Sequence, residues 1–429
     1  MTFVRFPLLR VGEHRGRMRR WFLLSLCFLA IAGSIGALLR LIYVVDMPWL
    51  DFKPWLHAHS HVAMLGWVFP ALLIALLGQD DRRFPRTFVV WMTISQALVA
   101  GMLFSFPVQG YGEISIACSV MQMIVSYVLI GIAWSHTRHW PKRGSRLLVR
   151  LAFVMQLVST LGIWAMGPIM TSDLAGTEWY YWSIQWFLHF QFNGWFWFAA
   201  MAIGSRWAER HGVQVRLDVF TTLLWALSAL LTFALAIAWS ERHVPVFAVN
   251  SLGVLLQCWA AWRTLMAMRK ASVQAYVKTT QWMRIMIGVM LLAMATKVAV
   301  QAAVSIPAVA TMGFTIRNYV IGFIHLNTLG AITSLLFAHA LMRGWFDERK
   351  RVVRIGLTLF IAGFAGSELL LFGQGTLFWA GLGMVPGYYW MLFGVSVLLP
   401  LGVIALLVSS VLGAHVQPAP LLPAADPRH

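Results

Sequence analysis

Five histidines that lie inside apolar segments carry the strongest chemical signal in this chain. His57, His59, His61, His189 and His325 each stand in a hydrophobic run long enough to cross a bilayer. An ionisable side chain is costly there, so such a residue marks a functional site by default. A neutral imidazole is a good ligand for haem iron and for copper. The five histidines therefore predict a metal or cofactor site within the membrane.

Three of these histidines start the same short pattern, in which four residues separate a histidine from a glycine. The pairs are His61 and Gly66, His189 and Gly194, and His325 and Gly330. The patterns lie four predicted spans apart, which predicts three pseudo-symmetric units of four helices each. The glycine, about one turn below, leaves a flat patch where a planar group or another helix can approach the backbone.

Helical spacing separates the three histidines of the first pattern. His57 and His61 are four residues apart and share a face, whereas His59 points nearly opposite. Two facing imidazoles hold a low-spin haem b, and we expect His61, or else His59, to pair with His325. His61 is preferred because its distance to the glycine matches that of His325. No Cys-x-x-Cys-His segment occurs among the three cysteines, so a haem would be held non-covalently.

Cations and amides near the expected haem can bind its carboxylates. Arg317 and Asn318 begin the tenth predicted span, and Lys297 and Gln301 end the ninth. Lys297 and Arg317 are equally expected as anchors that reach out to the membrane surface.

The elements that must position these residues are membrane helices. Of 429 residues, 60% are hydrophobic and only 11% are charged, whereas a soluble domain carries about a quarter charged residues. The sequence predicts an all-α polytopic membrane protein of about twelve spans, with a basic segment at 1–20, a membrane domain at 21–412 and a disordered, proline-rich tail at 413–429. The predicted spans are 21–45, 56–78, 87–108, 113–135, 147–169, 180–204, 218–240, 245–267, 284–305, 317–342, 354–375 and 387–411.

The distribution of basic residues predicts the orientation. The formal charge is +18, and 28 of the 33 Lys and Arg residues fall in alternate loops and termini, against Lys53, Arg242 and Arg317 on the other side. Positive loops stay in the cytoplasm, so both termini are expected there, in a bacterial-type inner membrane. This placement argues against nucleic acid as a partner, since the charges orient helices.

At these residues the chain resembles catalytic subunits of the haem-copper oxidase superfamily, in the nitric oxide reductase and cbb3-type branches. The stretches that carry the resemblance are His59-Ser-His61-Val-Ala-Met-Leu-Gly66, His189-Phe-Gln-Phe-Asn193-Gly194 and Phe323-Ile-His325-Leu-Asn-Thr-Leu-Gly330. The family has twelve helices in three arcs, haem ligands on helices two and ten, and non-haem metal ligands on helices six and seven. The resemblance implies that His325 binds the low-spin haem and that His189 remains from the second metal site.

The departures from the family are specific. Phe323 stands where the family has the ligand of its oxygen-reactive haem, and Asn193 stands where the reductase has a glutamate. Residues 218–240 contain no histidine, so the helix-seven ligands are missing. We expect the ordinary binuclear centre to be absent, which leaves open whether the protein is an oxidoreductase. We also expect Asn193 to face a pocket together with His189 rather than lipid, because an exposed carboxamide is costly in hydrocarbon.

Three functions fit these observations. The first is a haem b protein that transfers electrons or senses a small gas such as NO or O2, with a redox subunit, a cytochrome or a quinol as partner. The second is a secondary transporter that uses Lys297, Glu368 and the histidines as coupling groups. The third is a copper or other metal site without haem, formed by His57, His61, His189 and His325.

Overall fold

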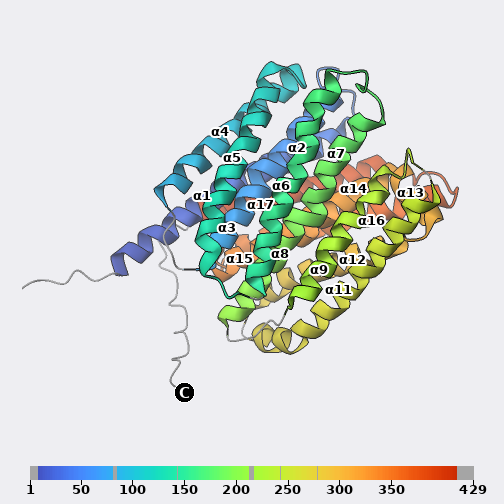
Figure 1. The fold of residues 1–429 in the computed structure, drawn as a ribbon. Helices are drawn as coiled ribbons and strands as arrows, with labels where there is room; N and C mark the ends of the chain where they lie inside the picture. Colours follow the sequence, from blue (N-terminus) through green and yellow to red (C-terminus); the bar gives the residue numbers. More distant parts are fainter. Residues whose placement is uncertain are drawn as a thin grey trace, which may run out of the picture.

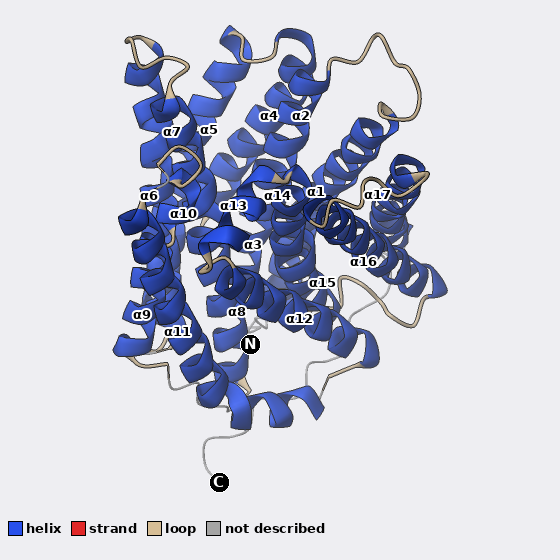
Figure 2. Cartoon of the chain, turned by 90° about the vertical axis from the view of Figure 1, so that its right-hand side faces the viewer, coloured by secondary structure: helices blue, strands red, loops and turns tan. Residues whose placement is uncertain are grey.

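The computed structural model describes residues 8–80, 85–142, 144–211, 217–241, 243–277 and 279–412. Helices and the turns between them account for all of this part of the chain, and no strand occurs in it (Figure 2). The protein is therefore all-α, as the sequence predicts. The expected disordered tail at 413–429 and the first seven residues of the basic segment lie outside the described residues.

The first half of the chain runs through long helices joined by short turns. Its elements are α1 (Leu8–Leu41), α2 (Phe52–His61), η1 (Val62–Val68), α3 (Phe69–Leu77), α4 (Arg86–Gln109), α5 (Glu113–His136), η2 (Thr137–His139) and α6 (Ser145–Met170). There follow α7 (Glu178–Phe190), η3 (Gln191–Trp195) and α8 (Phe196–Arg210). The helices α2, η1 and α3 form one continuous rod, and so do α7, η3 and α8.

The second half of the chain is also built of helices. Its elements are α9 (Val219–Leu231), α10 (Phe233–Ile237), α11 (Val244–Val277), α12 (Gln281–Ala303), α13 (Pro307–Thr315), α14 (Arg317–His325), η4 (Leu326–Thr333), α15 (Ser334–Met342), α16 (Arg351–Trp379) and α17 (Tyr388–Leu412). The rod formed by α14, η4 and α15 begins just after the short helix α13.

Eleven helical segments of the described residues are long and apolar enough to cross a membrane. They correspond to eleven of the predicted spans, and their ends differ from the prediction by a few residues. The exception is the predicted sixth span, which is helical from Glu178 to Arg210 but is less apolar because of its many Trp, Tyr, His and amide residues. Its central stretch, 190–203, is buried throughout, so protein rather than lipid surrounds it there.

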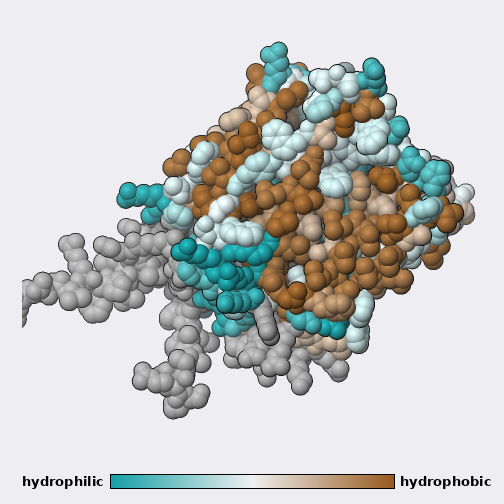
Figure 3. All heavy atoms as spheres, in the orientation of Figure 1, coloured by the Kyte–Doolittle hydropathy of each residue, from teal (hydrophilic) through white to brown (hydrophobic). Residues whose placement is uncertain are grey.

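The outer surface is that of a multi-pass membrane protein. A broad band of hydrophobic side chains covers the face in Figure 3, and hydrophilic side chains gather toward the ends of the helices. Large exposed residues such as Leu223, Leu255, Leu292 and Leu369 lie in the middle of α9, α11, α12 and α16. A surface of this kind is stable only in contact with lipid, so the protein is embedded in a bilayer.

The core lies around the rods that contain the histidine patterns. Every residue of α3 is buried, and α8 and α15 are buried along most of their length. The indole of Trp67 in η1 donates a hydrogen bond of 2.9 Å to the hydroxyl of Thr333 in η4. Helix α1 packs between α2 and α17, which brings the first and last helices of the chain side by side (Figure 1).

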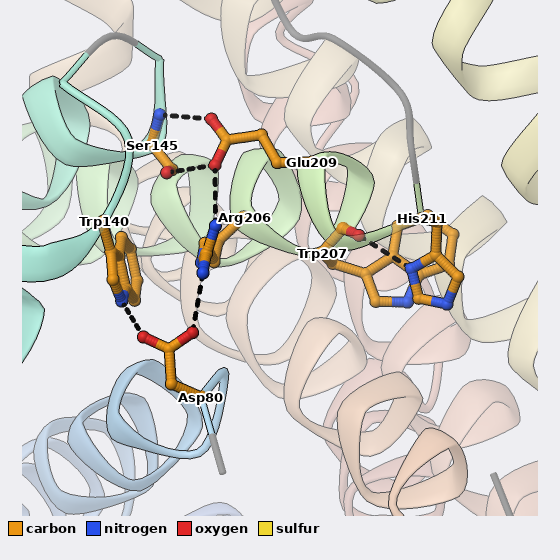
Figure 4. A network of polar contacts seen from close by, with 7 residues as sticks. All are labelled: Asp80, Trp140, Ser145, Arg206, Trp207, Glu209 and His211. Atoms are coloured by element: carbon orange, nitrogen blue, oxygen red, sulfur yellow. Dashed lines mark hydrogen bonds and ion pairs between the residues drawn. The ribbon is translucent and has the colours of Figure 1, made fainter. Parts of the chain in front are cut away.

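A polar network ties three helix ends together at one end of the bundle (Figure 4). Arg206 of α8 lies 2.7 Å from Asp80, which follows α3, and 3.5 Å from Glu209 of its own helix. Asp80 also accepts a hydrogen bond from the Trp140 indole, and Glu209 accepts two from Ser145 at the start of α6. The network therefore fixes α3, α6 and α8 relative to one another.

The eleventh predicted span, 354–375, extends further than expected. Gly375 lies inside α16, which continues to Trp379. The glycine is buried because the Tyr319 ring packs against it: a Cβ atom there would lie 2.9 Å from that ring. The following loop is formed by residues 380–387.

Candidate functional site

Each of the three histidine patterns continues directly into a π-helix. Val62–Val68 follows His61, Gln191–Trp195 follows Phe190, and Leu326–Thr333 follows His325. A π-helix bonds each N–H five residues back and is rare, and it is found frequently at functional sites. The three patterns therefore share an unusual backbone as well as a sequence.

The glycines of the patterns lie against neighbouring helices rather than against open space. A Cβ atom at Gly66 would lie 2.9 Å from Cβ of Phe28 in α1, and one at Gly194 would lie 2.7 Å from Cβ of Met155 in α6. At Gly330 it would lie 2.8 Å from Cβ of Ala293 in α12. Of the two partners expected for these patches, a planar group or a helix, the structure has the helix.

His59 is held firmly against helix α1. Its Nδ1 atom lies 2.8 Å from the carbonyl oxygen of Ala32, and its ring packs so close to Gly36 that a Cβ atom there would lie 2.9 Å from Cε1. When Nδ1–H donates to a carbonyl, the other nitrogen, Nε2, carries the free lone pair. The Nε2 atom of His59 is therefore the one that can bind a metal.

His325 shares the interior region of His59. Arg40 and His59 are both near enough for their charges to act on His325. The Nδ1 atom of His325 is buried and has no hydrogen-bond partner among the described residues. Both residues are half-buried. His325 and His59 therefore lie in the same interior region, near Arg40.

A cluster of charged and phenolic groups lies beside this histidine pair. Arg40 in α1 interacts electrostatically with Tyr388, Tyr43, Glu368 and Arg317. Neither carboxylate oxygen of Glu368 has a hydrogen-bond partner in the described part of the chain. Among these groups, Arg40 is the cation best placed to bind an acidic substituent of a cofactor. The sequence did not predict a role for Arg40, because it lies at the end of a hydrophobic segment.

Arg317 and Asn318 begin α14 at the edge of this cluster. The guanidinium of Arg317 is exposed and lies 5.5 Å from the centre of the Phe52 ring. Asn318 donates a hydrogen bond of 2.8 Å to the hydroxyl of Tyr388. Arg317 therefore lies beside α2, and its expected role at a haem carboxylate stays a prediction.

His57 and His61 face away from His325. Their rings lie 5.9 and 4.4 Å from the Phe106 ring, and the His57 ring lies 4.6 Å from that of Tyr111. The Nδ1 atom of His61 bonds the carbonyl of His57 at 2.9 Å. The expected pairing of His61 with His325 is not what the fold brings together.

His189 is engaged on both nitrogens. Its Nε2 atom lies 2.7 Å from the carbonyl oxygen of Ala229, and its Nδ1 atom lies 3.3 Å from the amide nitrogen of Asn193. An imidazole that donates through one nitrogen and accepts through the other has no lone pair left for a metal. The structure therefore argues against the expected role of His189 as a metal ligand.

The prediction for Asn193 is confirmed. Asn193 is only 8% exposed and lines a small cavity between α8, α9, α11 and α12. Its amide oxygen accepts a hydrogen bond of 3.0 Å from Gln301, whose own oxygen accepts one of 2.7 Å from Gln257. The polar chain His189–Asn193–Gln301–Gln257 thus crosses the interior of the bundle.

Two residues that were expected near the haem lie in this cavity region instead. Lys297 was expected at the surface or at a haem carboxylate, but its side chain is 2% exposed and points to the Trp197 ring. Gln301 belongs to the amide chain. The reason is the rotation of α12, which turns Lys297 and Gln301, four residues apart on one face, toward α8 and α11.

His339, near the inner end of the tenth predicted span, is a further buried histidine. It is 3% exposed and packs against Trp345, and neither of its ring nitrogens has a hydrogen-bond partner among the described residues. Its position near the end of a predicted span gave no signal of burial.

The described residues contain no group of three or more His, Cys, Asp or Glu side chains arranged to hold a metal ion. A haem with two axial histidines needs only two protein ligands. No protein-family model matches the chain, and no curated protein matches it either.

Proposed function

We propose that the chain is a haem b protein of the bacterial inner membrane, with His59 and His325 as the axial ligands. The observation that carries this proposal is that these two histidines, from α2 and α14, lie near enough to each other and to Arg40 for their charges to interact. Two neutral imidazoles from facing helices are the ligand set of a low-spin haem. The choice of His59 replaces the preference for His61, which faces Phe106.

The residues around the pair fit this cofactor. The hydrogen bond from His59 to Ala32 fixes the tautomer that ligates through Nε2, and Gly36 leaves room for the imidazole. Arg40 and Arg317 supply positive charge for the two haem carboxylates. A bound haem would supply a reversible one-electron change or a coordination position for a small gas such as NO or O2.

The relation to oxidase and nitric oxide reductase subunits is part of the proposal. It is supported by the three π-helical segments and by a regular spacing of contacts. Phe28, Met155 and Ala293 precede the glycines that they touch by 38, 39 and 37 residues, which is the pattern of three equivalent units. Counting the buried rod Glu178–Arg210 as a span gives twelve helices, four to a unit.

The orientation and partners follow from the charge distribution. The excess of Lys and Arg in alternate loops supports cytoplasmic termini. The haem would then lie in the outward-facing half of the membrane, near the α1–α2 connection. A redox subunit, a cytochrome or a quinol on that side would exchange electrons with it. The chain supplies no ordinary binuclear centre in this proposal, because Phe323 and the engaged His189 cannot ligate.

A secondary transporter is the second candidate, and one observation favours it. Glu368 carries a carboxylate with no hydrogen-bond partner among the described residues, and Lys297 carries an amine with no ion-pair partner among them. Intramembrane acids and bases of this kind serve as coupling groups in transporters. This candidate requires no haem, so a spectrum separates the two.

The test is the visible spectrum of the protein purified from haem-sufficient cells. We expect a Soret band, and reduced bands of a b-type haem, that are lost in His59→Ala and in His325→Ala. His61→Ala should keep them, and His243→Ala, an exposed histidine, is the control for general effects. Loss of the bands in His61→Ala but not in His59→Ala would show that His61, rather than His59, is the axial ligand. A wild type without a Soret band would refute the haem proposal.

A further inference from the structure

Helix α2 carries two further histidines that the proposed haem does not use. His57 and His61 are four residues apart in a regular α-helix, because the π-helical segment begins only at Val62. Side chains at this spacing are neighbours on one face, with Cβ atoms about 5–6 Å apart. The two imidazoles lie near enough for their charges to interact. A single metal ion can therefore be reached from both rings.

The hydrogen bond of His61 determines which of its ring nitrogens is free. Its Nδ1 atom lies 2.9 Å from the backbone carbonyl oxygen of His57. A carbonyl oxygen only accepts, so Nδ1 carries the hydrogen and Nε2 carries the lone pair. Histidines that bind metals have their other ring nitrogen bonded in this way. Within the described residues, no hydrogen bond occupies the Nε2 atom of His61 or either ring nitrogen of His57.

Aromatic rings hold the two imidazoles near one end of the bundle. The His61 ring lies 4.4 Å from the ring of Phe106, and the His57 ring lies 4.6 Å from that of Tyr111. Tyr111 belongs to the turn between α4 and α5 and is 53% exposed, and both histidines are half-buried. Apolar surroundings limit the access of solvent to such a site. Lys53, one turn before His57, is near enough for its positive charge to act on His57, so it opposes a bound cation.

We propose that His57 and His61 bind one Zn²⁺ ion through their imidazole nitrogens, with water at the remaining coordination positions. Imidazole ligands suit Zn²⁺ and its neighbours in the first transition row, whereas Mg²⁺ and Ca²⁺ prefer oxygen ligands. Two protein ligands leave positions open, so the ion exchanges with the surrounding solution, unlike that of a closed structural site. The site is separate from the proposed haem, because His59 points to the other side of α2 and contacts α1.

The first experiment measures Zn²⁺ binding by competition with a chromogenic chelator, on protein purified with a tag that contains no histidine. His57→Ala and His61→Ala should each weaken binding more than about tenfold, since even the loss of a group that orients a ligand costs 10–100-fold. The matched control is His211→Ala. The Nδ1 atom of His211 also bonds the carbonyl four residues earlier, but that residue is Trp207, so His211 is a single imidazole. A wild type without Zn²⁺ binding, or equal losses in all three variants, would overturn the proposal.

A variant that gains affinity guards against a simple folding defect. Lys53→Glu keeps both ligands and reverses the nearby charge, so it should tighten Zn²⁺ binding about threefold, for charges roughly 10 Å apart in water at physiological salt. An unchanged or weaker affinity in Lys53→Glu contradicts the assignment.

The visible spectrum of the same samples separates this site from the haem. His61→Ala should lose Zn²⁺ and keep the haem bands. Loss of both in His61→Ala would assign His61 to the haem and overturn the zinc site. If the wild type binds Zn²⁺ but has no Soret band, the haem proposal fails and the zinc site stands.

Discussion

The contacts of the three pattern glycines predict a specific loss of stability on adding one methyl group. In Gly66→Ala, Gly194→Ala and Gly330→Ala the new Cβ atom would lie 2.9, 2.7 and 2.8 Å from the Cβ atoms of Phe28, Met155 and Ala293. A Cβ atom moves only with its backbone, so rotamer changes cannot relieve these contacts. Ordinary contact begins at 3.4 Å, and the helices must therefore separate by about 0.5, 0.7 and 0.6 Å.

Overpacking of this kind costs about 1–3 kcal/mol for each substitution. The largest loss is expected for Gly330→Ala, because its Cβ atom would also lie 2.5 Å from the ring of Phe364. The assay is thermal unfolding in detergent, followed by the reaction of a fluorogenic thiol reagent with the half-buried Cys118 and Cys258 as they become fully exposed. Each variant should show a lower Tm than the wild type.

The matched control is Gly131→Ala. Gly131 lies in the second half of α5, and a Cβ atom there meets nothing within 4 Å. Alanine is also the better helix former, so the Tm of this variant should be unchanged or raised. If Gly330→Ala unfolds at the same temperature as Gly131→Ala, the helices do not meet at the pattern glycines, and the packing argument for three equivalent units fails.

Three further predictions concern the ends of the helices. Arg206→Ala should lower the free energy of unfolding by about 2–3 kcal/mol. This is less than the roughly 3–5 kcal/mol of a fully buried ion pair, because Asp80 and Glu209 keep their other hydrogen bonds. Arg206→Lys should restore part of the lost stability, and equal Tm values for Arg206→Ala and the wild type would refute a structural role. Asp218→Ala should cost about 1 kcal/mol through loss of the N-cap of α9, measured by the same assay. Hydrogen bonds from Thr221 and the charge of Arg263 lower the pKa of Asp218. Its contribution to the free energy of unfolding is therefore complete above the ordinary carboxyl pKa and is lost as the pH falls through the lowered pKa. A contribution that is lost when the pH is raised would contradict this prediction. Reporter fusions should be active outside after Gly110 and inside after Arg143, and the reverse pattern would refute the orientation.

The number and extent of the spans could be read from the sequence because hydropathy reports directly on contact with lipid. The rod Glu178–Arg210 shows the limit of that signal. Its Trp, Tyr and amide side chains reduce its hydropathy, but neighbouring helices cover its central stretch, so the segment does not need an apolar exterior there. The repeated histidine pattern identified this segment as a span, although its hydropathy alone is a weaker indication than that of the other spans.

The geometry of the site was predictable only within one helix. Helical spacing separated His59 from His57 and His61, and the structure confirms that they face opposite ways. Which of the two faces meets α14 depends on how whole helices are arranged, and nothing in the local sequence encodes that. The same limit explains Lys297: its place near a helix end suggested the surface, whereas the rotation of α12 turns it inward.

The π-helical segments could not be predicted from the sequence either, because no glycine or proline is needed to form them. Each amounts to one extra residue within a turn, which rotates everything beyond it by about 100° relative to an unbroken α-helix. Deleting one residue from Val62–Val68, Gln191–Trp195 or Leu326–Thr333 would leave the hydropathy of the span almost unchanged, so membrane insertion would proceed. The two halves of the span would then be out of phase with the bundle. Three single-residue insertions thus set the direction in which this protein presents its histidines.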